Sequence, residues 1–467
     1  MNKSSQSAGF TIFAFTWALA GLFHQLSFDN WRWHDPKGII LSLAILPVLL
    51  KPSSWQRFLV YLLIDWISVG IAFPEHPNHI VFSWVLNACI LTSFVIVAIR
   101  NKGDFNSDFA SQWFAAFVPW ARVMVCILYW FTFFHKVNVS FLNPECSCGA
   151  RLHLDITERI PFLPTALWAQ YLAMYGTLII ELAIPFVLLI NRTRLLAILG
   201  GLLFHGILAL HGHIGIFSFS ATIFALYTTF FSSALAADLK PPEWMTKIWR
   251  LILALFLLGV LLWTLRGLVP ALRLDDALRH ITKLGFLGFY MYLLLCLVLF
   301  GQSALKFRKS EQAMEGQLSA YPVLAIFPII ASVNGLGPYF GLRTESSYSM
   351  FSNLHTEGGV SNHLLMPSNM QITNWQKDLV EIVDTNDPDL LTARDHGDLV
   401  VYLELRRIRS REVPDFWVIF RRNGKEETYY ESRPETHDIL PKMNLLAGRY
   451  FYFRPVGQNP LKERCKH

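Results

Sequence analysis

A single lysine stands at the end of a long apolar stretch. Lys136 follows the aromatic-rich run 126–135, whose last residue is His135. At the end of a membrane helix, a lysine normally extends along the helix and brings its ammonium group to the lipid headgroups. In a dry pocket, burial instead disfavours the charged form, and a neutral amine can act as a general base. Both interpretations remain open, and Lys136 is the candidate catalytic residue.

Polar side chains near other apolar segments are candidates for contacting a substrate. Asn78 and His79 end the turn Pro74-Glu-His-Pro-Asn-His79, which is either a plain connector or part of a site. His205 lies in the apolar sequence Leu203-Phe-His205, shortly before His211 and His213. These histidines lack the spacing of a metal motif, and no Cys or acidic partners stand beside them. We therefore predict no metal site, and expect His205 to be a structural or substrate-contacting histidine.

Three charged residues fall inside predicted membrane helices. Asp65, Arg122 and Glu181 lie on three different segments. With a rise of about 1.5 Å per residue, all three come to a comparable depth in the inner half of the bilayer. Charges in a membrane are costly unless they are paired or functional. We expect a buried ion network that neutralises itself and fixes helix packing.

The cysteines permit several states. Cys146-Ser-Cys148 precedes the sixth apolar segment, and Cys465 lies near the other end of the sequence. Outside the cytoplasm a disulfide within this set is expected to persist. Two free thiols and a metal site remain open alternatives.

The elements that must hold these residues are membrane helices. Of the 467 residues, 53% are hydrophobic and only 16% are charged, whereas soluble chains carry about 25% charged residues. A helix needs about 20 mostly apolar residues to span a bilayer. Segments that meet or approach this length are 9–27, 38–50, 58–73, 80–99, 113–134, 166–190, 195–211, 214–233, 249–268, 284–301 and the interrupted 321–341. The net charge of +6 comes from scattered short connectors, which excludes a nucleic-acid-binding class and fits a protein of the lipid bilayer.

The sequence predicts a mainly α fold: a polytopic transmembrane bundle of about 9–11 segments over residues 1–341, followed by a small β-rich extramembrane domain over 342–467. Strands are expected at Leu399–Leu405, Phe416–Phe420 and Glu427–Tyr430, with a turn at Asn423-Gly424. The positive residues of the connectors place the N-terminus in the cytoplasm. An odd number of crossings then places the C-terminal domain outside the cytoplasm. Lys136, Asn78, His79 and His205 all map to that outer side.

Four stretches carry a further signal: Asn78-His79 before an apolar helix, the spacing from Arg122 to Lys136, the block Ile180–Leu189 with Phe204-His205 and Ile214–Ser218, and Ser347-Tyr-Ser-Met-Phe-Ser352. Together these stretches resemble the vitamin K-dependent γ-carboxylase family, and more broadly the HTTM (horizontally transferred transmembrane) domain. The match extends over about residues 70–355.

The resemblance implies a reaction. Lys136 would deprotonate vitamin K hydroquinone or a related naphthoquinone, and O2 would convert the quinol to an epoxide through a strongly basic intermediate. That base would remove the γ-proton of a glutamate in a protein or peptide substrate, and the carbanion would capture CO2. Asn78, His79 and His205 would contact the quinone. A membrane pocket suits this chemistry, because excluding water protects a carbanion.

Two departures from the family pattern are visible. His135 stands where the family has a lysine before its catalytic lysine, and the C-terminal domain is shorter than in the animal carboxylases. Recognition of glutamate is therefore less well supported than the quinone half of the reaction. The alternative hypothesis is an HTTM-domain protein without carboxylase activity, either a transporter or a membrane-anchored binding module.

Overall fold

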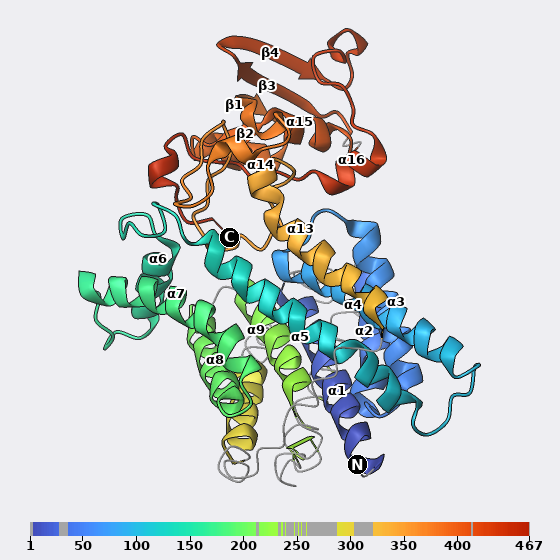
Figure 1. Cartoon of the computed structure of the whole chain (residues 1–467). Coiled ribbons are helices and arrows are strands. Elements are labelled where there is room, and N and C mark those ends of the chain that lie inside the picture. Colours follow the sequence, from blue (N-terminus) through green and yellow to red (C-terminus); the bar gives the residue numbers. More distant parts are fainter. Residues whose placement is uncertain are drawn as a thin grey trace. The chain divides into compact units, whose positions relative to one another are not determined.

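The computed structural model of the chain describes residues 3–27, 36–211, 214–231, 287–302, 321–411 and 414–466, with isolated positions between 235 and 258 (Figure 1). The predicted segment 249–268 and His213 lie outside the described residues, apart from single positions of that segment.

Helices dominate the described residues as far as residue 340. They are α1 (Lys3–Ser27), α2 (Pro36–Leu50), α3 (Trp55–Ala72), α4 (Asn78–Arg100), α5 (Phe109–His135), α6 (Cys148–Arg159), α7 (Leu167–Leu189), α8 (Arg194–Ala209), α9 (Ile214–Tyr227) and α13 (Ile326–Phe340), with 3-10 turns η1 (Thr228–Phe230) and η2 (Pro322–Ala325). The predicted mainly helical fold is confirmed.

Five helices of the described part are long and apolar enough to cross a membrane. They are Trp55–Ala72, Asn78–Arg100, Phe109–His135, Leu167–Leu189 and Pro322–Phe340. Four further apolar helices are shorter, at Ile40–Leu50, Arg194–Ala209, Gly215–Phe230 and Leu287–Gln302. The 25-residue α1 is not among the five. Several segments predicted from hydropathy are thus represented, among the described residues, by apolar helices of 10–17 residues.

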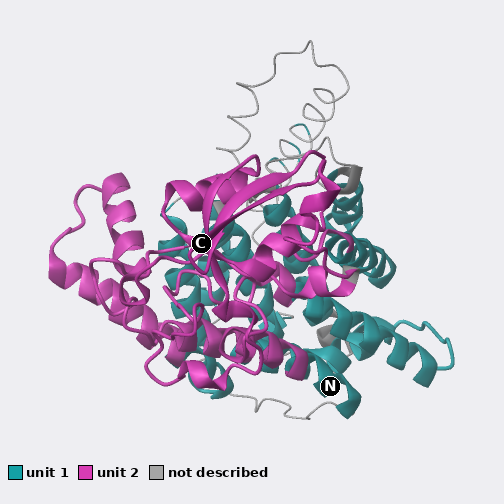
Figure 2. Ribbon diagram, turned by 90° about the horizontal axis from the view of Figure 1, so that it is seen from above, with its two compact units in different colours: residues 1–70, 83–126, 183–328 teal, residues 71–82, 127–182, 329–467 magenta. Residues whose placement is uncertain are grey.

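The chain divides into two compact units, each built from separate stretches of sequence (Figure 2). Unit 1 comprises residues 1–70, 83–126 and 183–328, and unit 2 comprises 71–82, 127–182 and 329–467. Unit 2 therefore joins the region after residue 342, expected to be a domain of its own, with the start of α4, the end of α5, α6, most of α7 and most of α13.

The C-terminal region contains a four-stranded antiparallel sheet in the order β2-β1-β3-β4. The strands are β1 (Leu379–Thr385), β2 (Leu399–Val401), β3 (Trp417–Arg422) and β4 (Lys425–Tyr430). Asn423 and Gly424 both have positive φ, as the tight turn of a two-residue hairpin requires, so the predicted turn is confirmed.

One predicted strand is corrected. Only Leu399–Val401 of the expected Leu399–Leu405 strand pairs with β1, and α15 (Tyr402–Arg409) begins directly afterwards. Leu405 and Ile408, three residues apart, are both buried on one face of this helix. The stretch follows the helical spacing rather than the alternation of a strand. Helices α14 (Pro388–Asp395) and α16 (Leu445–Tyr450), with 3-10 turns η3 (Ser368–Met370), η4 (Trp375–Lys377), η5 (Pro434–Thr436) and η6 (Pro460–Lys462), complete this region.

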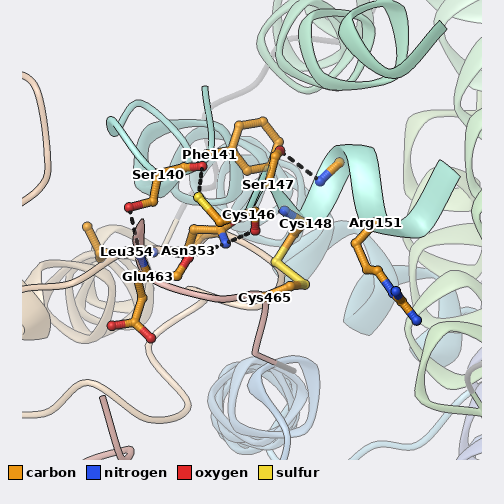
Figure 3. The surroundings of a disulfide bond; sticks show 12 residues. Ser140, Phe141, Cys146, Ser147, Cys148, Arg151, Asn353, Leu354, Glu463 and Cys465 are labelled. Atoms are coloured by element: carbon orange, nitrogen blue, oxygen red, sulfur yellow. Dashed lines mark hydrogen bonds between the residues drawn. A yellow bond between two sulfur atoms is a disulfide. The ribbon is translucent and has the colours of Figure 1, made fainter. Parts of the chain in front are cut away.

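The segment around residue 463 is fastened inside unit 2 by a disulfide and a buried carboxylate. Cys148, the first residue of α6, is bonded to Cys465 (Figure 3). Two residues earlier, the carboxylate of Glu463 contacts His355 Nδ1 at 2.7 Å and Lys466 Nζ at 2.8 Å. Burial raises the pKa of Glu463, but the hydrogen bond from His355 and the charge of Lys466 outweigh it and lower the pKa to about 2.

Because the pKa of Glu463 is lowered in the folded chain, we expect acid to destabilise the fold. A free glutamate has a pKa of about 4.3. Above that pH, Glu463 is ionised in both the folded and the unfolded chain, so it contributes its full share to the free energy of unfolding. As the pH falls toward 2, the unfolded chain binds the proton first and the stabilisation is lost. Thermal unfolding in detergent should therefore show a smaller stability loss between pH 5 and pH 3 for Glu463→Gln than for the unmodified chain. Equal pH slopes would contradict the assignment.

Glycine permits the close packing of α13 on α5. A Cβ built on Gly335 would lie 2.5 Å from the ring of Phe131, so only hydrogen fits there. We expect Gly335→Ala to destabilise the protein by about 1–3 kcal/mol through overpacking. Gly176→Ala, in α7, is the matched control because a Cβ there meets nothing within 4 Å. Thermal unfolding of both variants in detergent checks this, and equal stabilities would contradict the packing.

Candidate functional site

Lys136 follows α5 directly and is buried inside unit 2, with 4% of its surface exposed. Its ammonium donates to both carboxylate oxygens of Glu181, at 2.9 and 3.0 Å, and to the carbonyl oxygen of Thr132 at 3.0 Å. An ammonium group has three donors, and each of them has an acceptor here. The lysine is enclosed by protein, which decides against the lipid-headgroup interpretation.

The partner of Lys136 corrects the predicted ion network. Glu181 pairs with Lys136. Asp65 accepts a hydrogen bond of 2.7 Å from Asn87, and Arg122 Nε donates to the carbonyl oxygen of Thr229 at 2.7 Å. The prediction assumed that the number of residues from the inner end of a helix alone sets the depth of a residue in the bilayer. The contact shows that Glu181, the fifteenth residue of α7, lies level with the end of α5.

His135 is fully buried, and its partners determine its tautomer. Nε2 lies 3.0 Å from the carbonyl oxygen of Ser347, and Nδ1 lies 2.8 Å from the hydroxyl of Tyr339. A carbonyl oxygen only accepts, so Nε2 carries the hydrogen and donates. Nδ1 of the neutral ring then accepts from the Tyr339 hydroxyl. The imidazole before Lys136 is therefore fixed in orientation by two elements.

Asn78 reaches the same segment from the first turn of α4. Its Oδ1 accepts a hydrogen bond of 2.5 Å from the backbone N–H of Tyr348. Asn78 and His135 thus hold consecutive residues, Tyr348 and Ser347. His79 is buried beside Asn78. Asn78 and His135, the residue before Lys136, therefore contact the same segment within unit 2.

The segment 344–356 completes this neighbourhood with an unusual backbone. Ser346, Tyr348, Phe351 and Asn353 have φ angles of 56°, 67°, 52° and 53°. Residues other than glycine seldom adopt this left-handed region, and such strained residues concentrate at functional sites. Asn138 donates to the carbonyl oxygens of His135 and Ser352, at 2.7 and 2.6 Å, and so joins the segment to the end of α5.

The ring of Tyr348 lies among aromatic side chains of two helices. Its centroid is 6.1 Å from that of Phe82 in α4 and 6.3 Å from that of Phe131 in α5. Burial raises the pKa of the Tyr348 phenol well above its usual range, so the phenol stays protonated. The sequence indicated this tyrosine only through the family resemblance, and did not indicate Tyr339 or Asn138 at all.

His205 belongs to unit 1, whereas Lys136, Asn78 and His79 belong to unit 2. It lies in α8 and is buried against the rings of Phe204 and Phe219, each 5.2 Å away between centroids.

The cysteine alternatives are resolved for two of the three residues. Cys148 and Cys465 form the disulfide, and Cys146 is a free thiol whose Sγ lies 3.3 Å from the carbonyl oxygen of Ser140 (Figure 3). Burial raises the pKa of Cys146. Within the described ranges, His, Cys, Asp and Glu form no group of three that could hold a metal ion.

Comparison with models of protein families, with curated proteins and with solved structures finds no match.

The buried ion pair predicts strong energetic coupling. Lys136→Met leaves an unpaired carboxylate and Glu181→Leu an unpaired ammonium, so each variant should lose about 3–5 kcal/mol of stability. The double variant Lys136→Met/Glu181→Leu removes both charges and should recover most of that loss. A double-mutant cycle on thermal unfolding in detergent measures the coupling. Additive losses would show that the two groups do not depend on each other.

Proposed function

We propose that this chain is a multi-pass membrane enzyme that oxidises a reduced naphthoquinone to its epoxide, with Lys136 as the base. The observation that carries the proposal is the enclosed contact between Lys136 and Glu181. A lysine can remove a proton only in its neutral form, so the site must provide a place for the ammonium's own proton.

Glu181 is suited to receive that proton. Its two oxygens lie 2.9 and 3.0 Å from Lys136 Nζ, which is hydrogen-bonding distance. Two charges removed from water lose much of their hydration, so the cost of converting the ion pair to a neutral pair is smaller than in water. Transfer of one proton from Nζ to the carboxylate leaves a neutral amine. The amine can then take the proton of a quinol hydroxyl.

The polar groups around Lys136 are suited to orient a quinol. The oxygen of Asn78 is occupied by Tyr348, so the contact of Asn78 with a quinone oxygen would come from its Nδ2 hydrogens. His79 lies next to it in the same helical turn. We retain both as quinone-contacting residues, whereas the contact expected of His205, which belongs to unit 1, stays a prediction from the resemblance. In the oxidation, one atom of O2 enters the epoxide and the other leaves as water with the two quinol hydrogens.

Carboxylation of a glutamate with CO2, coupled to this oxidation, is the further part of the proposal. It requires a protein or peptide substrate to reach the site from the side on which the C-terminal region lies. We place that region outside the cytoplasm and the N-terminus inside. The disulfide between Cys148 and Cys465 supports this placement, because disulfides persist in oxidising compartments.

The direct experiment supplies vitamin K hydroquinone and O2 to the purified chain and measures epoxide by chromatography. Wild type should form epoxide, and Lys136→Ala should form at least about 100-fold less, as expected for loss of a general base. Glu181→Gln should also lose activity, because an amide cannot accept the proton. Fixation of labelled CO2 into a glutamate-containing peptide tests the coupled step separately.

Lys462→Ala is the matched control. Lys462 also pairs with a glutamate, Glu145, at 2.9 Å, but both side chains are exposed. It should keep wild-type activity. No epoxide from wild type, or equal epoxide from Lys136→Ala, would overturn the proposal. Epoxide without fixed CO2 would remove only the carboxylation.

A further inference from the structure

One stretch of unit 2 exposes apolar side chains without any charge beside them. Between Glu357 and Lys377 the sequence contains no Asp, Glu, Lys or Arg. We call residues 360–375 the apolar loop. Its exposed side chains are Val360, Leu364, Leu365, Met370, Ile372 and Trp375, with Leu365 at 66% and Ile372 at 73% exposure. A water-facing surface of this kind is costly.

The apolar loop is fixed to the ends of two candidate membrane spans. Leu364 N donates to the carbonyl oxygen of Val137, and Val139 N donates to that of Asn362, both at 3.0 Å, directly after α5. Ile372 N donates to the carbonyl oxygen of Phe340, the last residue of α13, at 3.0 Å. The loop therefore lies at the level where both helices end.

His363 strengthens the attachment to α5. Its Nε2 lies 2.8 Å from the carbonyl oxygen of Phe134, and its Nδ1 accepts from the N–H groups of Leu365 and Met366 at 3.1 Å each. Since Nδ1 accepts and Nε2 donates, the ring is neutral. Burial lowers the pKa of His363, so the loop stays uncharged at neutral pH.

The exposed apolar surface also occurs on the adjoining helices. Trp130, about one and a half turns before the end of α5, and Ile330 and Val333, in the middle of α13, are exposed, as lipid-facing residues are. Trp130 and Trp375 are of the type that concentrates at the membrane–water interface. The occupant that fits is the lipid already surrounding these helices.

We propose that the apolar loop inserts into the membrane interface, so that unit 2 contacts the bilayer through residues 360–375 as well as through its helices. Leu364, Leu365 and Ile372 lie among the upper acyl chains. The inference does not depend on the proposed reaction, since it uses only the attachment, exposure and charge of the loop.

The test places an environment-sensitive fluorophore on Leu365→Cys in the full chain, in phosphatidylcholine nanodiscs, where both membrane faces are accessible. Cys89, Cys126, Cys146 and Cys296 are replaced by alanine, which leaves only the disulfide pair. Lys425→Cys, at the exposed β3–β4 hairpin, is the control position. Brominated acyl chains should quench the label at 365 several-fold more than aqueous iodide does, and the order should reverse at 425.

Two results would overturn the proposal. If iodide quenches the label at 365 as strongly as at 425, the loop lies in water. If the label at 365 is shielded from both quenchers, protein covers the loop, and a doubled mass of the particle would identify a second copy of the chain. Labelled variants are compared after matching their thermal transitions to the cysteine-replaced background.

Discussion

The contact between Lys136 and Glu181 is the constraint from which the arrangement of unit 2 follows. A buried ammonium and a buried carboxylate are each unstable alone, so the end of α5 and the middle of α7 must meet wherever these helices lie in the bilayer. Thr132 supplies the third acceptor from the same turn of α5. With the end of α5 held beside the middle of α7, His135 and Asn138 lie in the polar region beyond the end of α5. The segment 344–356 lies in that region and accepts one hydrogen bond from each of them, through Ser347 and Ser352.

Strain and polarity are concentrated in that segment. Its left-handed residues are held by side chains from other elements: Asn78 binds the N–H of Tyr348, and Asn138 binds the carbonyl group of Ser352. A backbone that needs several outside contacts to keep its conformation also keeps those contacts in fixed positions. The same hydrogen bonds that stabilise the segment therefore also fix the orientation of Asn78 and Asn138.

The sequence predicted those elements whose structure depends on a short local pattern alone. Apolar length predicted the main helices, and Asn423-Gly424 predicted the hairpin. Lys136 and Asn78 were identified because a polar group at the end of an apolar helix is conspicuous. The pairing of Lys136 with Glu181 was not predictable, since the tilt of α7 and the level of each helix depend on packing. Nor does any local pattern predict that Ser346, Tyr348, Phe351 and Asn353 adopt positive φ. At Leu399–Leu405, β-forming side chains were outweighed by burial of one helical face.

The disulfide places a constraint on the order of biogenesis. Cys148 and Cys465 are 317 residues apart in sequence. While the ribosome is translating the intervening helices, Cys148 has no partner, and Cys146, two residues away, is the cysteine nearest to it in sequence. The correct bond can form only after the helices between them have been inserted and residue 465 has reached the same compartment. Unit 2 is therefore completed late, after its helices have been inserted into the membrane. If Cys148 first pairs with Cys146, thiol–disulfide exchange in the compartment that holds these cysteines is needed to correct the bond.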